Sequence, residues 1–164
     1  MHLRKVYNAE ILTDSQLQTR TTTQEDILHI ASHTEKDQVG YIGLLLQNSK
    51  VNPKHEGLRY CRMAVLNACE TNDGMSYLNE GKISLTWLFL SDGADAVITS
   101  IGKVDNHASA ELFKVFYKYL SEGKSVSESL SLAKREIRNR TPEWANPYYW
   151  SLYELIGSDL TFYR

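Results

Sequence analysis

The sequence is poor in cysteine and has no marked excess of charge of either sign. Only Cys61 and Cys69 occur among 164 residues, which is too few for a disulfide framework and predicts reduced thiols, as in the cytoplasm. The 18 Lys and Arg residues are opposed by 20 Asp and Glu residues, so the net charge is −2. A chain with this balance has no basic field to attract nucleic acid or an anionic membrane surface, and we expect neither as a partner.

Long apolar runs and several familiar motifs are missing as well. No segment approaches the roughly 20 apolar residues of a membrane-spanning helix, and the N-terminus lacks the hydrophobic core of a signal peptide. The metal-binding spacings CxxC and HExxH do not occur, and no glycine-rich phosphate loop follows an apolar run. The sequence therefore disfavours a metal centre and a nucleotide-binding domain, and no cofactor is predicted.

Short apolar runs, typical of buried strands, alternate with helical patterns along the chain. We expect extended segments at 5–12, 27–31, 41–47, 63–68, 94–101 and 148–156, helices at 14–22, 83–90, 106–120 and 126–139, and loops at 49–59 and 70–79. This order predicts an α/β fold, with a mostly parallel sheet that helices cover on both faces. No linker, repeat or low-complexity tract interrupts the sequence, so we expect a single domain over residues 1–164.

Two of the apolar runs end on reactive side chains. The run that starts at Ile27 leads to His33, and the run that starts at Met63 leads to Cys69. In a parallel α/β sheet, functional groups collect outside the carboxyl ends of the strands. A histidine and a cysteine brought to one edge can pair as imidazolium and thiolate, which is the nucleophile of a cysteine peptidase.

Each reactive residue also has a structural interpretation. A cysteine at the end of a buried strand is more often a small core residue, and a histidine after a strand is more often structural. His29 lies within the first run, and Cys61 is flanked by a tyrosine and an arginine, so we interpret both as structural. The catalytic interpretation of His33 and Cys69 depends on their occurring together, each after a strand and before a polar loop.

Several segments, taken in order, resemble one known family. They are Leu28–His33, Val65–Thr71, Gly81–Thr86, Gly93–Ile101, Lys103–Asp105, Phe116–Leu120 with Gly123, and Asn146–Trp150 with Gly157. Together they are similar to the CHAT domain, a caspase-like peptidase domain often found beside tetratricopeptide repeats. The resemblance covers roughly residues 25–157 and is more specific than any single motif.

The resemblance implies a caspase- and separase-like three-layer αβα sandwich with a His33–Cys69 dyad. In the implied reaction, the Cys69 thiolate attacks the scissile carbonyl of a protein substrate. His33 protonates the leaving amine and later activates water to hydrolyse the acyl-enzyme. The resemblance also implies that backbone N–H groups of Cys69 and of Thr34, the residue after His33, hold the oxyanion.

The sequence departs from the family pattern at three places. Thr34 follows the histidine where relatives commonly carry glycine, and Gly102 precedes Lys-Val-Asp where they usually carry tryptophan. Residues 1–24 are also fewer than family members generally have before the histidine segment. We therefore expect a partial N-terminal portion, with strands that are missing, trimmed or supplied by another chain.

Other polar residues are candidates for orienting the nucleophile or for lining a substrate pocket. Asn67 and Glu70 flank Cys69 and are the candidates for orienting it. Asp37, Asp73 and Asp105 are candidate pocket acids, and one that points inward would favour a basic residue before the scissile bond. The structural alternatives are a strand-terminating role for the asparagine and turn or cap roles for the aspartates.

Two classes of function follow from these observations. The first is a cysteine endopeptidase that acts as an effector under the control of a sensor or tetratricopeptide-repeat partner. The second is a catalytically silent, peptidase-like protein-interaction module. The presence of both His33 and Cys69 favours the first, because a silent relative has no chemical need of either residue.

Overall fold

A computed structural model describes residues 25–36, 42–46, 49–51, 61–68, 74–77 and 81–162. The extended segment predicted at 5–12 and the helix predicted at 14–22 lie outside these residues.

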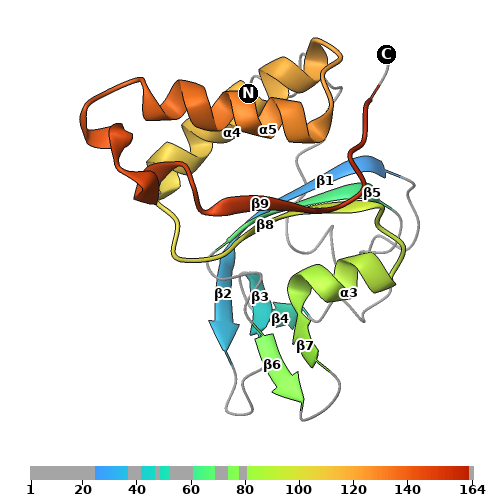
Figure 1. Ribbon diagram of the computed structural model, residues 1–164. Helices are drawn as coiled ribbons and strands as arrows, with labels where there is room; N and C mark the ends of the chain where they lie inside the picture. Colours follow the sequence, from blue (N-terminus) through green and yellow to red (C-terminus); the bar gives the residue numbers. More distant parts are fainter. Residues whose placement is uncertain are drawn as a thin grey trace.

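Within the described residues, four strands form a central sheet in the order β1-β5-β8-β9 (Figure 1). The parallel strands are β1 (Glu25–Ala31), β5 (Cys61–Asn67) and β8 (Ala96–Ser100). The fourth strand, β9 (Tyr153–Gly157), pairs antiparallel with β8. The mostly parallel sheet predicted from the apolar runs is thereby confirmed.

Helices cover both faces of this sheet (Figure 1). The helices α4 (Asn106–Ser121) and α5 (Val126–Arg138) lie on one face, and α3 (Leu85–Ser91) lies on the other. Strand side chains alternate between the two layers, as the period of two requires. On β5, for example, Met63 enters the core beneath α4 and α5, whereas Ala64 enters the core beneath α3.

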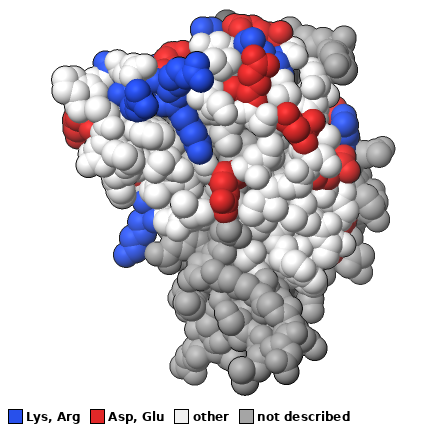
Figure 2. All heavy atoms as spheres, in the orientation of Figure 1, with Lys and Arg blue, Asp and Glu red and all other residues white. Residues whose placement is uncertain are grey.

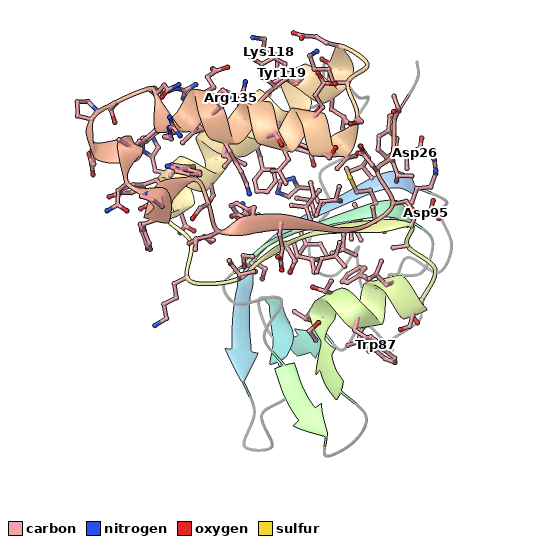
Figure 3. All side chains as sticks on the ribbon, viewed as in Figure 1. Asp26, Trp87, Asp95, Lys118, Tyr119 and Arg135 are labelled. Carbon is pink, nitrogen blue, oxygen red and sulfur yellow. The ribbon has the colours of Figure 1, made fainter. Side chains whose placement is uncertain are left out.

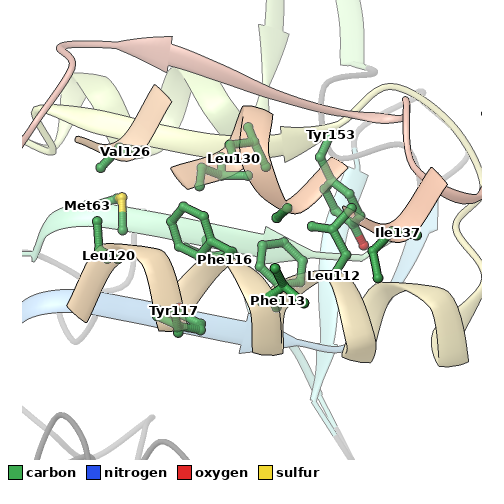
Figure 4. Close-up of a cluster of buried hydrophobic side chains, with 14 of the residues drawn as sticks. Met63, Leu112, Phe113, Phe116, Tyr117, Leu120, Val126, Leu130, Ile137 and Tyr153 are labelled. Carbon is green, nitrogen blue, oxygen red and sulfur yellow. The ribbon is translucent and has the colours of Figure 1, made fainter. Parts of the chain in front are cut away.

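The larger of the two cores is dominated by aromatic rings (Figure 4). On α4, Phe113 and Phe116 meet edge to face, with ring centroids 6.0 Å apart. Phe113 also meets Tyr153 of β9 at 4.8 Å. Since each aromatic side chain buries roughly 150–250 Å² at about 25 cal/mol per Å², this cluster is a major source of the fold's stability.

Side-chain caps set where the helices begin. The caps are Ser84 for α3, Asp105 for α4 and Ser125 for α5, and each accepts a hydrogen bond from a backbone N–H in the first turn. The helix predicted to start at residue 83 therefore starts at Leu85. The preceding residues belong to β7 (Gly81–Ser84), and Ser84 is extended, as an N-cap residue is.

Further strands form small antiparallel sheets in the described part of the chain. One sheet contains β2 (His33–Lys36), β3 (Ile42–Leu46) and β4 (Ser49–Val51), and another pairs β6 (Gly74–Tyr77) with β7. The predicted loops at 49–59 and 70–79 are wrong where β4 and β6 lie. With three and four residues, β4 and β6 are too short for a pattern of alternation to identify them, and they depend on pairing with a neighbour, which local sequence does not reveal.

The last strand also starts later than the predicted 148–156. Two 3₁₀ turns, Glu143–Ala145 and Pro147–Tyr149, occupy the preceding segment. The Asn146 side chain accepts the N–H of Tyr148 at 3.0 Å, and proline suits the first position of a helical turn. Capping and proline geometry thus outweigh the β-propensity of the aromatic residues here.

Basic residues on α5 and just after it lie among acidic and polar partners. Figure 2 shows Lys and Arg side chains gathered over the helical layer, with Asp and Glu side chains close by. Arg140 pairs with Glu111 and lies 3.4 Å from Glu136. Lys134 turns toward the sheet, where its Nζ donates to the carbonyl oxygen of Tyr153. This face is therefore a mixed surface and not a concentrated basic field.

Candidate active site

The strands β1 and β5 are parallel neighbours whose final residues are paired. Their register places Ala31 opposite Asn67, and the N–H of Ser32 donates to the carbonyl oxygen of Asn67 at 3.3 Å. Along the sequence, His33 comes two residues after Ala31 and Cys69 comes two residues after Asn67. Cys69 itself lies outside the described residues.

The backbone of His33 begins β2, which pairs antiparallel with β3. His33 lies opposite Leu45, and Thr34 lies opposite Leu44. Figure 1 shows β2 leaving the central sheet and running toward the small sheets. The polar loop predicted after His33 is wrong for residues 34–36, which continue β2. A strand held by cross-strand pairing follows instead, and extended backbone suits a β-branched residue such as Thr34.

The Asn67-Ala68 dipeptide, which precedes Cys69, is held by side chains from two other elements, β8 and β9. Asn67 Oδ1 accepts the Tyr153 hydroxyl at 2.5 Å, and that hydroxyl is also hydrogen-bonded to Ser109 Oγ of α4 at 2.9 Å. Ala68 is buried, and its carbonyl oxygen accepts a hydrogen bond from Ser100 Oγ. The candidate orienting residue Asn67 is therefore held by Tyr153 of β9, whose hydroxyl is in turn bonded to α4.

The structure describes one of the three candidate pocket acids. Asp105 caps α4, and its Oδ1 accepts the N–H of Ala108 at 2.8 Å, so the structure gives it the cap role considered as its alternative. Asp37, Asp73 and the candidate orienting residue Glu70 lie outside the described residues. Their roles remain predictions.

His29 lies inside β1 and packs, partly buried, against α4. Its Nδ1 is 2.8 Å from the hydroxyl of Tyr117, and its ring meets Phe113 edge to face with centroids 4.9 Å apart. Desolvation lowers the pKa of His29 from 6.5 to about 4, so the imidazole is neutral at neutral pH. These contacts agree with the structural interpretation of His29.

We expect His29 to make the protein less stable in mild acid. The pKa of His29 is lower in the folded state than the unperturbed value of 6.5. The contribution of the neutral imidazole to stability is therefore complete above pH 6.5 and is lost as the pH falls toward about 4. The contribution lost between pH 7.5 and pH 5 is about 2 kcal/mol. Urea unfolding at both pH values should show this loss in the wild type and its absence in His29→Gln. An identical pH dependence in the two proteins would contradict the assignment.

Cys61 lies at the start of β5, at the opposite end of the strand from Asn67. The residue is 6% exposed, and desolvation raises the pKa of its thiol to about 11. Arg62 lies near the same end of the sheet, which Asp26 and Asp95 mark in Figure 3. Its Nη1 is 3.9 Å from Asp26 Oδ1, and its Nε is 3.7 Å from Asp95 Oδ2. Because a buried, protonated thiol is unreactive, Cys61 is a structural cysteine.

Sequence reasoning missed the three hydroxyl residues Ser100, Ser109 and Tyr153. Ser100 is 32 residues from Ala68, and Tyr153 is 86 residues from Asn67, so no spacing rule connects the partners. The available signal was weak: Ser100 is a polar residue near the end of a predicted buried strand. Tyr153 lay within a predicted strand and gave no sign of a polar contact.

Neither a metal cluster nor a membrane span is found in the part of the chain that the structure describes. No group of three or more His, Cys, Asp or Glu side chains among these residues could hold a metal ion. No helix in the same ranges has the length and apolar character needed to cross a bilayer.

Comparison with known proteins gives one family match and two similar curated proteins. The sequence matches the CHAT domain over residues 2–158. It is 29% identical to tetratricopeptide repeat protein 28 of Mus musculus over 99 residues, which are 60% of this chain and 4% of that protein. It is 33% identical to tetratricopeptide repeat protein 28 of Homo sapiens over 81 residues, 49% of this chain and 3% of that protein. The chain thus spans only a small part of the length of these relatives.

Proposed function

The chain belongs to the CHAT domain family, a caspase-like peptidase family, and we propose that it is a cysteine endopeptidase with His33 and Cys69 as its catalytic dyad. The observation that carries the proposal is the register of β1 and β5, in which the last residues, Ala31 and Asn67, are paired. His33 and Cys69 each follow that pair by two residues. We therefore expect their side chains at one edge of the sheet, where α/β folds bind their ligands.

The dyad cleaves a peptide bond in two stages. His33 takes the thiol proton of Cys69, and the thiolate attacks the scissile carbonyl carbon to give a tetrahedral oxyanion, which the N–H groups of Cys69 and Thr34 stabilise. When the C–N bond breaks, His33 gives its proton to the leaving amine and an acyl-enzyme remains. His33 then takes a proton from water, whose oxygen attacks the thioester, releasing the second product and regenerating the thiol.

The other residues of the site act on the nucleophile through the backbone. Asn67 is tied to Tyr153 by its side chain, and the peptide that joins Ala68 to Cys69 is tied to Ser100 by its carbonyl oxygen. Because the two residues before Cys69 are held in this way, they do not have to be ordered at the moment of reaction, which lowers the entropic part of the barrier.

The biological setting is a further part of the proposal. A catalytic thiolate needs a reducing compartment, and we propose the cytoplasm. We also propose that a tetratricopeptide-repeat segment or a separate sensor protein controls the activity, because the similar mouse and human proteins carry tetratricopeptide repeat in their names. The substrate is a protein, and Asp37 or Asp73 would select a basic residue if its carboxylate faces the substrate pocket.

Alkylation by iodoacetamide tests the proposed nucleophile. The intact protein is labelled between pH 5 and pH 9 and the modified mass is followed with time. We expect one fast-reacting thiol below pH 7, which Cys69→Ala removes and Cys61→Ala retains, because the buried Cys61 thiol is protonated throughout this range.

Slow labelling that follows the pH profile of an ordinary thiol would contradict an active dyad in this chain. That result would favour the second class of function, a catalytically silent interaction module. A fast-reacting thiol that survives in Cys69→Ala would show instead that the nucleophile has been misassigned.

A further inference from the structure

We propose that Ser100 and Tyr153 are positioning residues whose hydroxyl groups hold the Asn67-Ala68 dipeptide and thereby direct the backbone N–H of Cys69 toward the oxyanion. The inference rests on the proposed function for the role of Cys69. It adds two residues from β8 and β9 that lie outside the dyad.

Ser100 acts on the peptide that joins Ala68 to Cys69. It is the last residue of β8, is fully buried, and donates its Oγ–H to the carbonyl oxygen of Ala68. The pairing between β5 and β8 runs from Met63 opposite Ala96 to Val65 opposite Ile98. Beyond this ladder, the Ser100 hydroxyl donates to the Ala68 carbonyl oxygen the hydrogen bond that a backbone N–H of a neighbouring strand would otherwise supply.

A carbonyl that is held in place also sets the direction of the next N–H. The peptide unit is planar and almost always trans, so the oxygen of Ala68 and the N–H of Cys69 belong to one rigid plane and point in opposite directions. A hydrogen bond to the oxygen also polarises the N–H and makes it a better donor. Ser100 therefore acts on the group that the proposed mechanism uses to stabilise the oxyanion.

Tyr153 holds the same dipeptide from β9. It lies directly opposite Ser100 in the β8–β9 register, so the two hydroxyl residues come from one cross-strand pair. Its hydroxyl reaches Asn67 Oδ1 and Ser109 Oγ, and its carbonyl oxygen accepts from Lys134 Nζ. Tyr153 is thus held at both its backbone and its side chain, and it can act as a rigid support for Asn67.

Another buried serine in the same protein provides a contrast. Ser129 of α5 is fully buried, and its Oγ has no hydrogen-bond partner among the residues that the structure describes. Burial of a hydroxyl is costly without a partner, so the bonded hydroxyls of Ser100 and Tyr153 contribute interactions that Ser129 does not. Ser129→Ala is therefore a matched control for Ser100→Ala: it removes the same atom from an equally buried site.

Two reagents separate positioning of the N–H from activation of the thiol. Iodoacetamide reacts by displacement at carbon and forms no oxyanion, whereas p-nitrophenyl acetate acylates a thiolate through a tetrahedral oxyanion. The ratio of the two rate constants for Cys69 therefore reports on the oxyanion donors. This ratio is measured for the wild type, for Ser100→Ala and Tyr153→Phe, and for the controls Ser129→Ala and Tyr119→Phe. Tyr119→Phe removes a hydroxyl that is bonded to Glu136 on the helical layer.

We expect Ser100→Ala to lower the acylation rate by roughly tenfold to a hundredfold while the alkylation rate changes by less than about threefold. Tyr153→Phe should lower the acylation rate by less, because Asn67 is one residue further from Cys69. Neither control should change the ratio. Ratios equal to that of the wild type in both Ser100→Ala and Tyr153→Phe would overturn the inference.

Amide hydrogen exchange keeps this test separate from the test of the proposed function. If the wild-type thiol of Cys69 is not activated, the proposed function fails, and exchange in peptides that cover residues 66–70 then decides on positioning alone. Faster exchange there in Ser100→Ala and Tyr153→Phe than in the two controls would support a holding role for the hydroxyls. Exchange that matches the controls would overturn it.

Discussion

Replacing His33 by alanine is expected to slow the alkylation of Cys69 by about tenfold to a hundredfold at pH 6.5. A thiol paired with an imidazolium is largely ionised at this pH, whereas an unpaired thiol with a pKa near 8.5 is ionised to only about 1%. Cleavage of a protein substrate should fall further, by roughly 10²–10⁴-fold, because His33 also protonates the leaving amine and activates water. The measurement is the second-order rate constant for iodoacetamide as a function of pH.

The matched control for this experiment is His29→Gln. His29 lies four residues earlier in the same segment, but its ring packs against Phe113 and is hydrogen-bonded to Tyr117. Its replacement should leave the pH profile of Cys69 in place. A profile that shifts equally in His29→Gln and His33→Ala would indicate that both changes act through the fold of the segment and not through an imidazole at the site.

The edge of the sheet that carries the candidate site could be predicted from the sequence. Apolar runs reveal buried strands, and polar or reactive residues at their ends reveal where those strands finish. The runs before His33 and Cys69 were therefore interpretable without a structure. The register that aligns Ala31 with Asn67 could not be predicted in this way. It depends on which residue of one strand faces which residue of the other, and the apolar runs fit more than one alignment.

The elements that support the site were hidden for a different reason. The hydrogen bonds from Ser100 and Tyr153 join residues far apart in the chain, and a serine or tyrosine in a strand carries no local mark of its partner. Strand β2 was missed because it is stabilised by pairing with β3, while its own sequence is polar. Local patterns thus predicted the strands that form the core and failed where tertiary pairing decides the structure.

The two single-residue departures from the family pattern are compatible with the local structure. Thr34 lies within β2, where the extended backbone does not require glycine. At Gly102, an added Cβ would lie 3.5 Å from Leu152 Cδ2, which is an ordinary contact. A larger side chain at position 102 would therefore contact Leu152. The lack of the family's tryptophan here does not by itself disrupt the edge of the sheet near Ser100.

Among Gly93, Gly102, Gly123 and Gly157, replacement by alanine is expected to cost the most stability at Gly157. Gly157 has φ +103° and lies opposite Ala96, and an added Cβ would stand 2.4 Å from the carbonyl oxygen of Asp95. That oxygen cannot retreat freely, because it accepts the N–H of Ser158 at 2.8 Å. The strained backbone costs roughly 1–2 kcal/mol and the clash about 1–3 kcal/mol more, measured as the free energy of unfolding in urea.

Gly93→Ala separates these two contributions. Gly93 has nearly the same φ, +105°, but an added Cβ there would meet no atom within 4 Å. It should therefore show the backbone cost alone, and the difference between the variants measures the clash. Because Gly157 and Tyr153 belong to the same short strand, a large difference means that close contact with Asp95 fixes the register that sets Tyr153 opposite Ser100. Equal losses would mean that β9 shifts away from Asp95 at little cost, so that the position of Tyr153 must be set by its own contacts with Asn67, Ser109 and Lys134.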